Sequence, residues 1–248
     1  MVKRIIASIL LLLLPGTVFA AGAGVPLMSA NNDVNDKASL QRGAQLFVNY
    51  CLSCHSAKFM RYNRMGEDLR ISDEAIIDNL LFTGDKTGET MMVALTKEQG
   101  DKWFGKAPPD LSVVARSKGP DWIYTFLLSF YEDDDPTRPF GVNNTVLEGA
   151  AMPAVLAGLQ GIQVLVEPSD DEVHHGDNQL PEFKLVRQGS MNPAEFRRAV
   201  RDLVNFLDYM GEPAQLIRGK VGVWVLLFLA LFTWLARSLY KEYWKDIH

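Results

Sequence analysis

Apolar residues at helical spacing are the most frequent pattern along this chain. Between residues 36 and 50, Leu40, Ala44, Phe47 and Val48 recur as one face of a helix would require, which predicts an amphipathic helix. The other predicted elements are helices over residues 72–82, 120–131 and 193–211 and a strand over residues 162–166. Because strand patterns are so few, we expect a mainly α fold with long loops between its elements.

The helix predicted after residue 192 has well-marked ends. Asn192 is placed to cap it, with Pro193 at the first helical position and Glu195 at the third, as in a capping box. Gly211 followed by Pro213 marks the C-terminal end. The apolar face between these limits consists of Phe196, Val200, Leu203, Phe206 and Leu207.

A transmembrane helix is predicted near the C-terminus, over residues 219–237. The run from Val221 to Ala236 contains no charged residue, whereas a buried core helix would be amphipathic. This run is slightly shorter than the usual ~17 to 25 residues, but the flanking Lys220 and Arg237 can extend to the two membrane interfaces. We therefore expect one membrane anchor in contact with lipid.

The N-terminus has the order of a secretory signal peptide. Basic residues, an apolar run and small residues follow one another, which predicts a signal peptide over residues 1–20 with cleavage after Ala20 or Ala23. A retained anchor is the alternative, but the apolar run is shorter than the ~20 residues that a span needs. Export would place residues 24–218 as one domain on the periplasmic side of a bacterial inner membrane and leave residues 238–248 as a short cytoplasmic tail.

The charge of the chain bears on its partners. The whole chain has a net charge of −5, and residues 24–218 alone carry −9. An acidic surface argues against nucleic-acid binding and favours a basic protein partner, which it attracts over a distance. Acidity that serves solubility alone is the alternative.

Cys51, Cys54 and His55 form the strongest motif, and these two cysteines are the only ones in the chain. In an oxidising compartment they can form a disulfide or a redox-active pair. The histidine changes this interpretation, because residues i, i+3 and i+4 of a helical turn share one face. Cys-X-X-Cys-His is the attachment signature of c-type haem, with two thioethers and one imidazole on the same ligand. We predict one covalently bound haem c, with His55 as an axial iron ligand.

The second axial ligand decides whether the iron carries electrons or binds a small molecule. Met152 is one candidate, because it lies among small residues and precedes a proline. Met91 and Met92 remain open, and His174 and His175 are rival ligands in an acidic segment. Nothing nearby resembles a nucleophile or an oxyanion hole, so no substrate chemistry is expected of the chain by itself.

Several segments together resemble the cytochrome c1 family. They are CLSCHS at residues 51–56, RYNR at 61–64, PPDLS at 108–112, RPFGVNN at 138–144, AMP at 151–153 and FLDYMGEP at 206–213. The first of these is shared by all c-type cytochromes, whereas PPDLS, the Met-Pro segment and YMGEP are much more specific in combination. The resemblance covers nearly the whole chain after the predicted signal peptide.

The resemblance implies a membrane-anchored haem subunit of the cytochrome bc1 complex, the ubiquinol–cytochrome c oxidoreductase of respiratory chains. It implies that Cys51 and Cys54 attach the haem and that His55 and Met152 are its iron ligands. It also implies that the haem takes an electron from the Rieske iron–sulfur protein and passes it to a c-type cytochrome, with the anchor beside cytochrome b. The chain is then a redox subunit of a larger enzyme complex.

Some positions match the family only in part. Arg116 and Lys118 lie where the family places a cationic partner for a haem propionate, but relatives often have arginine where Lys118 stands; two solvated charges are the alternative. After Met152, many bacterial relatives have His and Trp where this chain has Ala154 and Ala157. This difference implies altered packing and an altered haem potential.

A membrane-anchored monohaem carrier of a terminal oxidase or nitric oxide reductase is the alternative function. It shares the motif and the anchor, but it gives no reason for the 97 positions that separate His55 from Met152. A peroxidase-type enzyme would need an open sixth position on its iron. A haem sensor would need an output domain, which residues 238–248 are too few to form.

Overall fold

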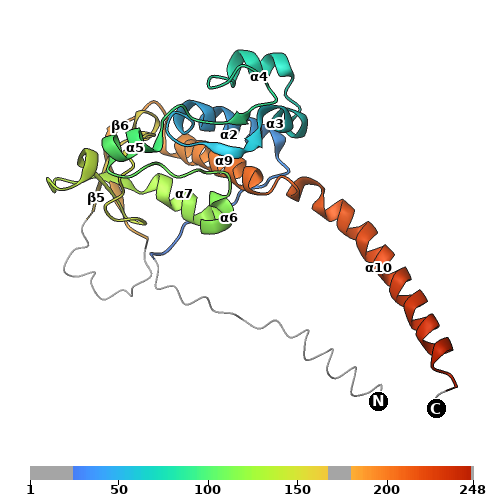
Figure 1. The fold of residues 1–248 in the computed structure, drawn as a ribbon. Coiled ribbons are helices and arrows are strands. Elements are labelled where there is room, and N and C mark those ends of the chain that lie inside the picture. Colours follow the sequence, from blue (N-terminus) through green and yellow to red (C-terminus); the bar gives the residue numbers. More distant parts are fainter. Residues whose placement is uncertain (1–24, 167–179, 247–248) are drawn as a thin grey trace, which may run out of the picture.

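The structure is a computed structural model that describes residues 25–166 and 180–246. Within these ranges helices dominate, which confirms the predicted mainly α class. Figure 1 shows most of the helices gathered in one body, from which a single long helix extends. The predicted signal peptide at residues 1–20 and the rival ligands His174 and His175 lie outside the described residues.

Two long helices form the centre of this body, α2 (Lys37–Tyr50) and α9 (Pro193–Gly211). Both were predicted, and both begin as their sequences suggest. Asp36 caps α2, and Asn192 forms the expected capping box with Glu195 at the start of α9. The predicted apolar faces of both helices are buried. Each helix therefore removes its apolar face from water against the other, which stabilises the pair.

The close approach of α2 and α9 depends on a glycine. A Cβ atom at Gly43 would lie 2.1 Å from the backbone oxygen of Asp202 and 2.7 Å from Cβ of Phe206. The rings of Phe47 and Phe206 meet beside it, with centroids 5.6 Å apart. The buried carboxylate of Asp202 is compensated by Arg42, whose Nε donates to it at 2.6 Å. Sterics and polar pairing thus define how the two helices cross.

Two shorter helices, α6 (Val114–Lys118) and α7 (Pro120–Leu128), pack along α9. The helix predicted over residues 120–131 begins at Pro120 as expected, but it ends at Leu128. Its last residues belong to a strand, because Phe130 pairs with Asn144 across a sheet. A tertiary contact therefore ends this helix earlier than its apolar pattern suggests.

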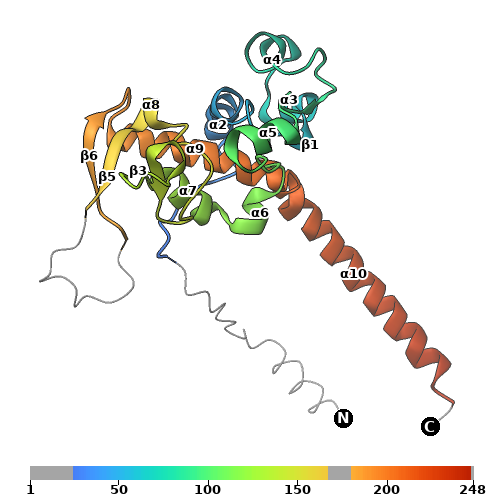
Figure 2. The same cartoon turned by 60° about the vertical axis from the view of Figure 1, so that its left-hand side comes forward.

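A four-stranded sheet covers one end of the body, and the sequence pattern predicted only one of its strands. The order is β4 (Val142–Asn144), β3 (Phe130–Glu132), β5 (Gly161–Leu165) and β6 (Phe183–Gln188). Only the pairing of β3 with β5 is parallel. The predicted strand at residues 162–166 corresponds to β5. Figure 2 shows β5 and β6 at the end of the body opposite the start of the long helix.

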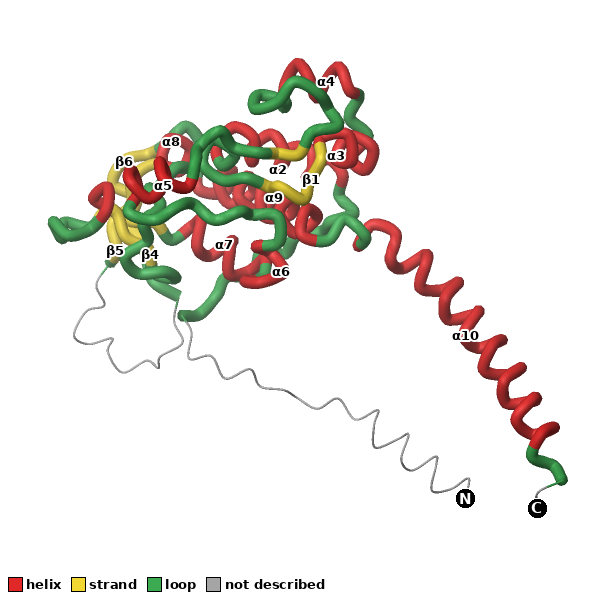
Figure 3. The backbone as a smooth tube through the Cα atoms, viewed as in Figure 1, coloured by secondary structure: helices red, strands yellow, loops and turns green. Residues whose placement is uncertain are grey.

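The remaining elements are short and are joined by extended loops, as Figure 3 shows. They are β1 (Ala57–Arg61), α3 (Tyr62–Leu69), α4 (Asp73–Asn79), β2 (Thr90–Met91), α5 (Lys97–Phe104), the 3-10 helix η1 (Pro139–Gly141) and α8 (Ala157–Gln160). The helix predicted over residues 72–82 corresponds to α4, which has Ser72 as its N-cap and ends at Asn79, before residue 82. The long loops expected from the sequence are confirmed.

The long helix is α10 (Gln215–Tyr243), and none of its residues is buried. Its 29 residues include a window with a mean hydropathy of 1.9, and they extend for about 44 Å at the usual helical rise. In the described part of the chain it is the one helix long and apolar enough to cross a membrane. It contains all of the predicted span at residues 219–237 and continues beyond both ends. An exposed apolar helix of this length is stable in lipid, so α10 is the membrane anchor.

Candidate haem site

Cys51, Cys54 and His55 lie on one turn that continues α2. The Cys51 N–H donates to the carbonyl of Phe47 at 2.8 Å. The N–H groups of Cys54 and His55 both donate to the Cys51 carbonyl, at 3.1 and 2.8 Å. The predicted helix that leads into the motif and the predicted turn are both confirmed. Cys51 is buried and Cys54 is half-buried, and neither is in a disulfide.

The surroundings of Cys51 favour an uncharged sulfur. Burial, with a smaller contribution from Cys54, raises the pKa of the Cys51 thiol to about 12. A thiolate ligand for a metal ion is therefore disfavoured at neutral pH, whereas a neutral thioether suits the site. The described residues contain no group of three or more His, Cys, Asp and Glu side chains placed to hold a metal ion.

His55 is held in the tautomer that an iron ligand needs. Its Nδ1 lies 2.7 Å from the carbonyl oxygen of Pro109. Because a carbonyl can only accept, Nδ1 carries the proton and Nε2 keeps its lone pair. Burial lowers the pKa of the imidazole, against smaller opposing effects of the Pro109 carbonyl and Asp110. The ring is therefore neutral at pH 7, and its Nδ1–H makes the hydrogen bond to a carbonyl that metal-binding histidines usually make with the nitrogen that does not bind the metal.

The segment that supplies the Pro109 carbonyl is attached to the chain just after the motif. Three bonds attach it: Leu111 N–H to Ser56 O at 2.8 Å, Lys58 N–H to Asp110 Oδ2 at 3.0 Å and Phe59 N–H to Ser112 Oγ at 3.1 Å. A fourth bond, from Ser112 N–H to Asp110 Oδ1 at 2.9 Å, lies within the segment. Sequence reasoning used this PPDLS segment only as a mark of resemblance and missed its role as the support of His55. The Pro-Pro-Asp-X-Ser composition predicts a turn, but it gives no sign of a partner more than fifty residues away.

Met152 lies on a separate loop, between β4 and α8, and is half-buried against the core. It lines a small, mostly apolar pocket together with Leu127 of α7, Phe130 of β3 and Gln160 of α8. The loop therefore presents its thioether at the corner where α7 turns into β3. A soft sulfur in an apolar wall suits a haem iron.

The loop of Met152 and the attachment turn share one support. Leu156 and Leu159, which follow Met152, line a second apolar pocket together with Leu46 of α2. The other wall of that pocket belongs to α9, with Phe196, Ala199, Val200 and Leu203. The structure thus packs both the Met152 loop and the helix that leads into the Cys51 turn against α9, although they are far apart in the sequence.

The other candidate residues have different surroundings. Met91 is fully buried in β2, and Met92 is exposed. Arg116 lies at the end of α6, with Nη1 3.7 Å from a carboxylate oxygen of Glu212. The ammonium of Lys118 lies 5.2 Å from the ring centroid of Trp122. The role of the two cations as propionate partners stays a prediction.

The chain was compared with known proteins. Residues 29–83 and 85–247 match the Cytochrome C1 family. Cytochrome c1 of Allochromatium vinosum is 49% identical over 99% of this chain and 100% of that protein. The chain belongs to the cytochrome c1 family. The ammonia monooxygenase gamma subunit of Nitrosomonas europaea is 45% identical over 100% of this chain and 99% of that protein. The mitochondrial cytochrome c1, heme protein, of Schizosaccharomyces pombe is 28% identical over 86% of this chain and 68% of that protein.

Membership of the cytochrome c1 family confirms the predicted cofactor and function. The chain carries one covalently bound haem c and is an electron-transfer subunit of the ubiquinol–cytochrome c oxidoreductase complex. Its residues fit the cofactor, because two unpaired cysteines and a neutral imidazole with a free Nε2 lie on one turn. None of the relatives named above is a terminal oxidase or nitric oxide reductase subunit.

Proposed function

We propose that this cytochrome c1 chain takes electrons from a Rieske iron–sulfur protein and passes them to a c-type cytochrome, in a complex that also contains cytochrome b. The observation that carries the proposal is the turn of Cys51, Cys54 and His55, with Nδ1 of His55 bonded to the Pro109 carbonyl at 2.7 Å. This turn lies in a chain that belongs to the cytochrome c1 family and has a membrane helix.

Each site residue has one role in this proposal. Cys51 and Cys54 would hold the haem through two thioether bonds, and Nε2 of His55 would bind its iron. The sulfur of Met152 would be the second iron ligand, which its position in the apolar wall between α7 and α8 supports. The bound haem supplies a one-electron Fe(III)/Fe(II) couple, whose potential a Met/His ligand pair raises.

The surroundings of these residues favour electron transfer over chemistry on a substrate. With His55 and Met152 both bound to it, the iron would have no position left for oxygen or peroxide. The net charge of −9 over residues 24–218 favours a basic electron acceptor, which it attracts before contact. Rapid and salt-sensitive association with the acceptor is therefore expected.

Arg116 and Lys118 are proposed as cationic partners of a haem propionate. Both lie on α6, the helix that directly follows the segment supporting His55. Arg116 also reaches Glu212, so a propionate would compete with that carboxylate. The half-exposed position of Arg116 leaves its side chain free to turn between the two.

The membrane topology is proposed from the sequence. Residues 1–20 are a signal peptide, residues 24–218 form the haem domain on the periplasmic side of the bacterial inner membrane, and residues 219–237 span it. Residues 238–248 remain in the cytoplasm. The exposed apolar surface of α10 supports the span, and export is supported by the covalent haem, whose attachment motif is typical of c-type cytochromes.

Copurification tests the proposed partners. An affinity tag after residue 248 allows the chain to be extracted from membranes in mild detergent, with haem staining to follow it. Cytochrome b and a Rieske protein are expected to copurify, and the purified complex should reduce a c-type cytochrome with ubiquinol. If oxidase or reductase subunits copurify in their place, the proposed partners are wrong, while the haem site is unaffected.

A further inference from the structure

The loop that leads from β4 to Met152 is held by side chains and not by a helix or a strand. Asn144 Oδ1 accepts hydrogen bonds from the backbone N–H groups of Val146 and Leu147, at 2.9 and 3.2 Å. Asn143 Oδ1 accepts one from the N–H of Gly149, at 2.9 Å. Two neighbouring asparagines therefore bind three backbone donors of a seven-residue connection, residues 145–151.

The two asparagines are themselves fixed. Their exposed fractions are 2% for Asn143 and 1% for Asn144. Asn144 Nδ2 donates to the carbonyl of Phe126 at 2.8 Å, and Asn143 Nδ2 donates to Asp133 Oδ2 at 2.9 Å. Each amide thus uses both its acceptor and its donor. Aspartate cannot donate and serine is too short to do both, so the chemistry of the site calls for an amide.

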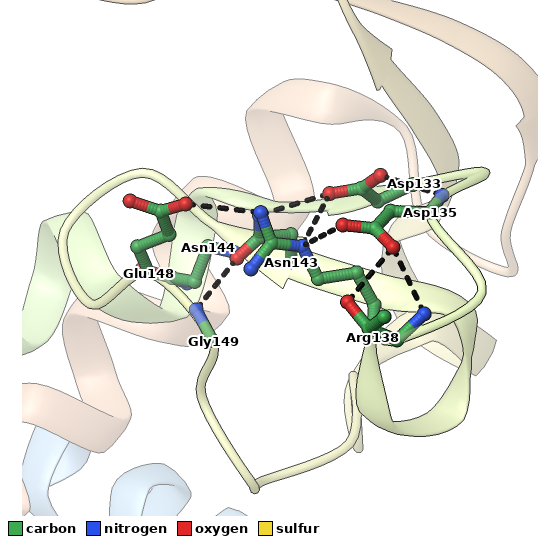
Figure 4. Close-up of polar contacts among 8 residues, drawn as sticks. Asp133, Asp135, Arg138, Asn143, Asn144, Glu148 and Gly149 are labelled. Carbon is green, nitrogen blue, oxygen red and sulfur yellow. Dashed lines mark hydrogen bonds and ion pairs between the residues drawn. The ribbon is translucent and has the colours of Figure 1, made fainter.

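Arg138 bonds to Asp133, the partner of Asn143, and to Glu148 in the loop. Figure 4 shows its side chain among Asp133, Asp135 and Glu148, next to Asn143. Its Nε donates to Asp133 Oδ2 at 3.1 Å, the same oxygen that Asn143 contacts. The bond to Glu148 at 2.9 Å involves a carboxylate that is 77% exposed, so this ion pair contributes little. The support for Asn143 therefore comes mainly from Asp133.

The anchor of the loop and the pocket of Met152 belong to the same corner of the fold. Asn144 binds the carbonyl of Phe126 in α7 and pairs with Phe130 in β3. The next residue of α7, Leu127, and Phe130 itself line the same pocket as Met152. A single rigid corner thus holds the beginning of the loop through asparagine amides and its end through apolar contact.

We propose that Asn143 and Asn144 are positioning residues for the distal ligand, and that their amides hold the 145–151 loop so that the Met152 sulfur stays on the iron. This inference rests on the proposed role of Met152 as that ligand. The residues act through the backbone and touch neither the haem nor Met152 in the contacts given above. Without the amides, the three N–H groups can bond to water and the loop can leave the iron.

The test replaces each amide in the full-length chain, as N143A and N144A, and follows the iron ligands directly. Asn205→Ala is the matched control, because Asn205 is equally buried and its amide donates to the Asp33 carbonyl and to Ser39 Oγ, neither of which belongs to this loop. Haem staining reports attachment, the methionine–iron(III) charge-transfer band reports ligation, and carbon monoxide binding to the reduced protein reports an open position.

N143A and N144A are expected to keep the covalent haem, weaken the charge-transfer band and lower the potential. Carbon monoxide affinity should rise by about tenfold or more, the usual scale of effect when a residue that holds a metal ligand in place is removed. Asn205→Ala should lower stability and leave band, potential and carbon monoxide binding unchanged. If all three variants show wild-type ligation, the inference is overturned.

Two further measurements keep the test decisive. Hydrogen exchange on the unmodified protein needs no variant. The backbone amides of Val146, Leu147 and Gly149 are expected to exchange slowly. Exchange at the rate of free peptide would overturn the inference even if the variants fail to fold. Met152→Leu is the reference for complete loss of the ligand. If M152L leaves the potential unchanged, Met152 is not the iron ligand. If M152L lowers the potential but N143A and N144A keep wild-type ligation, Met152 is the ligand and only the role of the two asparagines is wrong.

Discussion

The imidazole Nδ1 of His55 and the carbonyl oxygen of Pro109 lie 2.7 Å apart, although 54 positions separate the two residues. This bond fixes the tautomer of the imidazole and leaves Nε2 as the nitrogen that could bind a haem iron. It also makes the 109–112 segment part of the candidate haem site. Since a backbone carbonyl cannot be removed by substitution, the role of the segment is tested at the side chains that attach it.

Asp110→Ala should loosen this segment. Asp110 Oδ2 accepts from the Lys58 N–H and Oδ1 from the Ser112 N–H. Loss of these bonds is expected to reduce the free energy of unfolding at neutral pH by about 1 to 3 kcal/mol. Urea denaturation of both proteins measures the difference. Asp78→Ala, at an exposed position of α4, is the control and should leave stability unchanged.

The same variant has a defined pH dependence. Burial raises the pKa of Asp110, but hydrogen bonds from Ser112 and from the Lys58 backbone outweigh it and hold the pKa below its usual value. A carboxyl group with a lowered folded-state pKa stabilises the fold above its unfolded pKa, and this stabilisation is lost as pH falls through the folded value. The difference between wild type and Asp110→Ala should therefore shrink below about pH 4. A difference that stays constant on acidification would contradict this account.

Met152→Leu tests the distal ligand. The haem should remain covalently attached, because Cys51 and Cys54 are untouched, while its reduction potential should fall sharply without the thioether. Redox titration measures the potential. Met92→Leu, at an exposed methionine, is the control and should keep the wild-type potential. An unchanged potential in Met152→Leu would mean that another residue is the ligand.

Gly43→Ala tests the contact between α2 and α9. The new Cβ would overlap the backbone oxygen of Asp202, so the helices must move apart, at a cost of about 1 to 3 kcal/mol. Thermal unfolding compares this variant with Gly158→Ala, a glycine of α8 whose added Cβ would meet nothing within 4 Å. Gly158→Ala should be neutral or slightly stabilising. Equal melting temperatures for the two variants would show that the helices tolerate the extra atom.

A chain that ends at Arg218 tests whether the haem domain folds without the membrane anchor. No residue of α10 is buried, so removal of residues 219–248 should leave the fold intact. The bond between Arg218 and Glu212, 3.1 Å long, is retained in this chain. We expect the shortened protein to leave the membrane fraction with its haem attached and its unfolding temperature unchanged. Loss of haem or a large drop in unfolding temperature would show that α10 supports the site.

Local patterns in the sequence were sufficient to predict those elements of this protein that are formed by interactions between residues close in the sequence. The capping box of Asn192 and Glu195 joins residues three positions apart, and α9 begins there as predicted. The attachment turn of Cys51 and His55 likewise closes within one helical turn. The apolar run of α10 needs no partner within the chain, so its composition alone identifies it. Family membership, haem c and the anchor follow from such features.

Only the tertiary structure decided which contacts support the two proposed iron ligands, His55 and Met152. The Pro109 carbonyl reaches His55 from more than fifty residues away, and the amides of Asn143 and Asn144 hold a loop that has no regular pattern. Strands β3 and β4 are three residues long, too short for alternation to show, and they form because each pairs with the other. Hydrogen bonds between distant segments leave no periodic trace in the sequence, since either partner can be any residue with a backbone donor or acceptor. The chain must fold before these contacts exist.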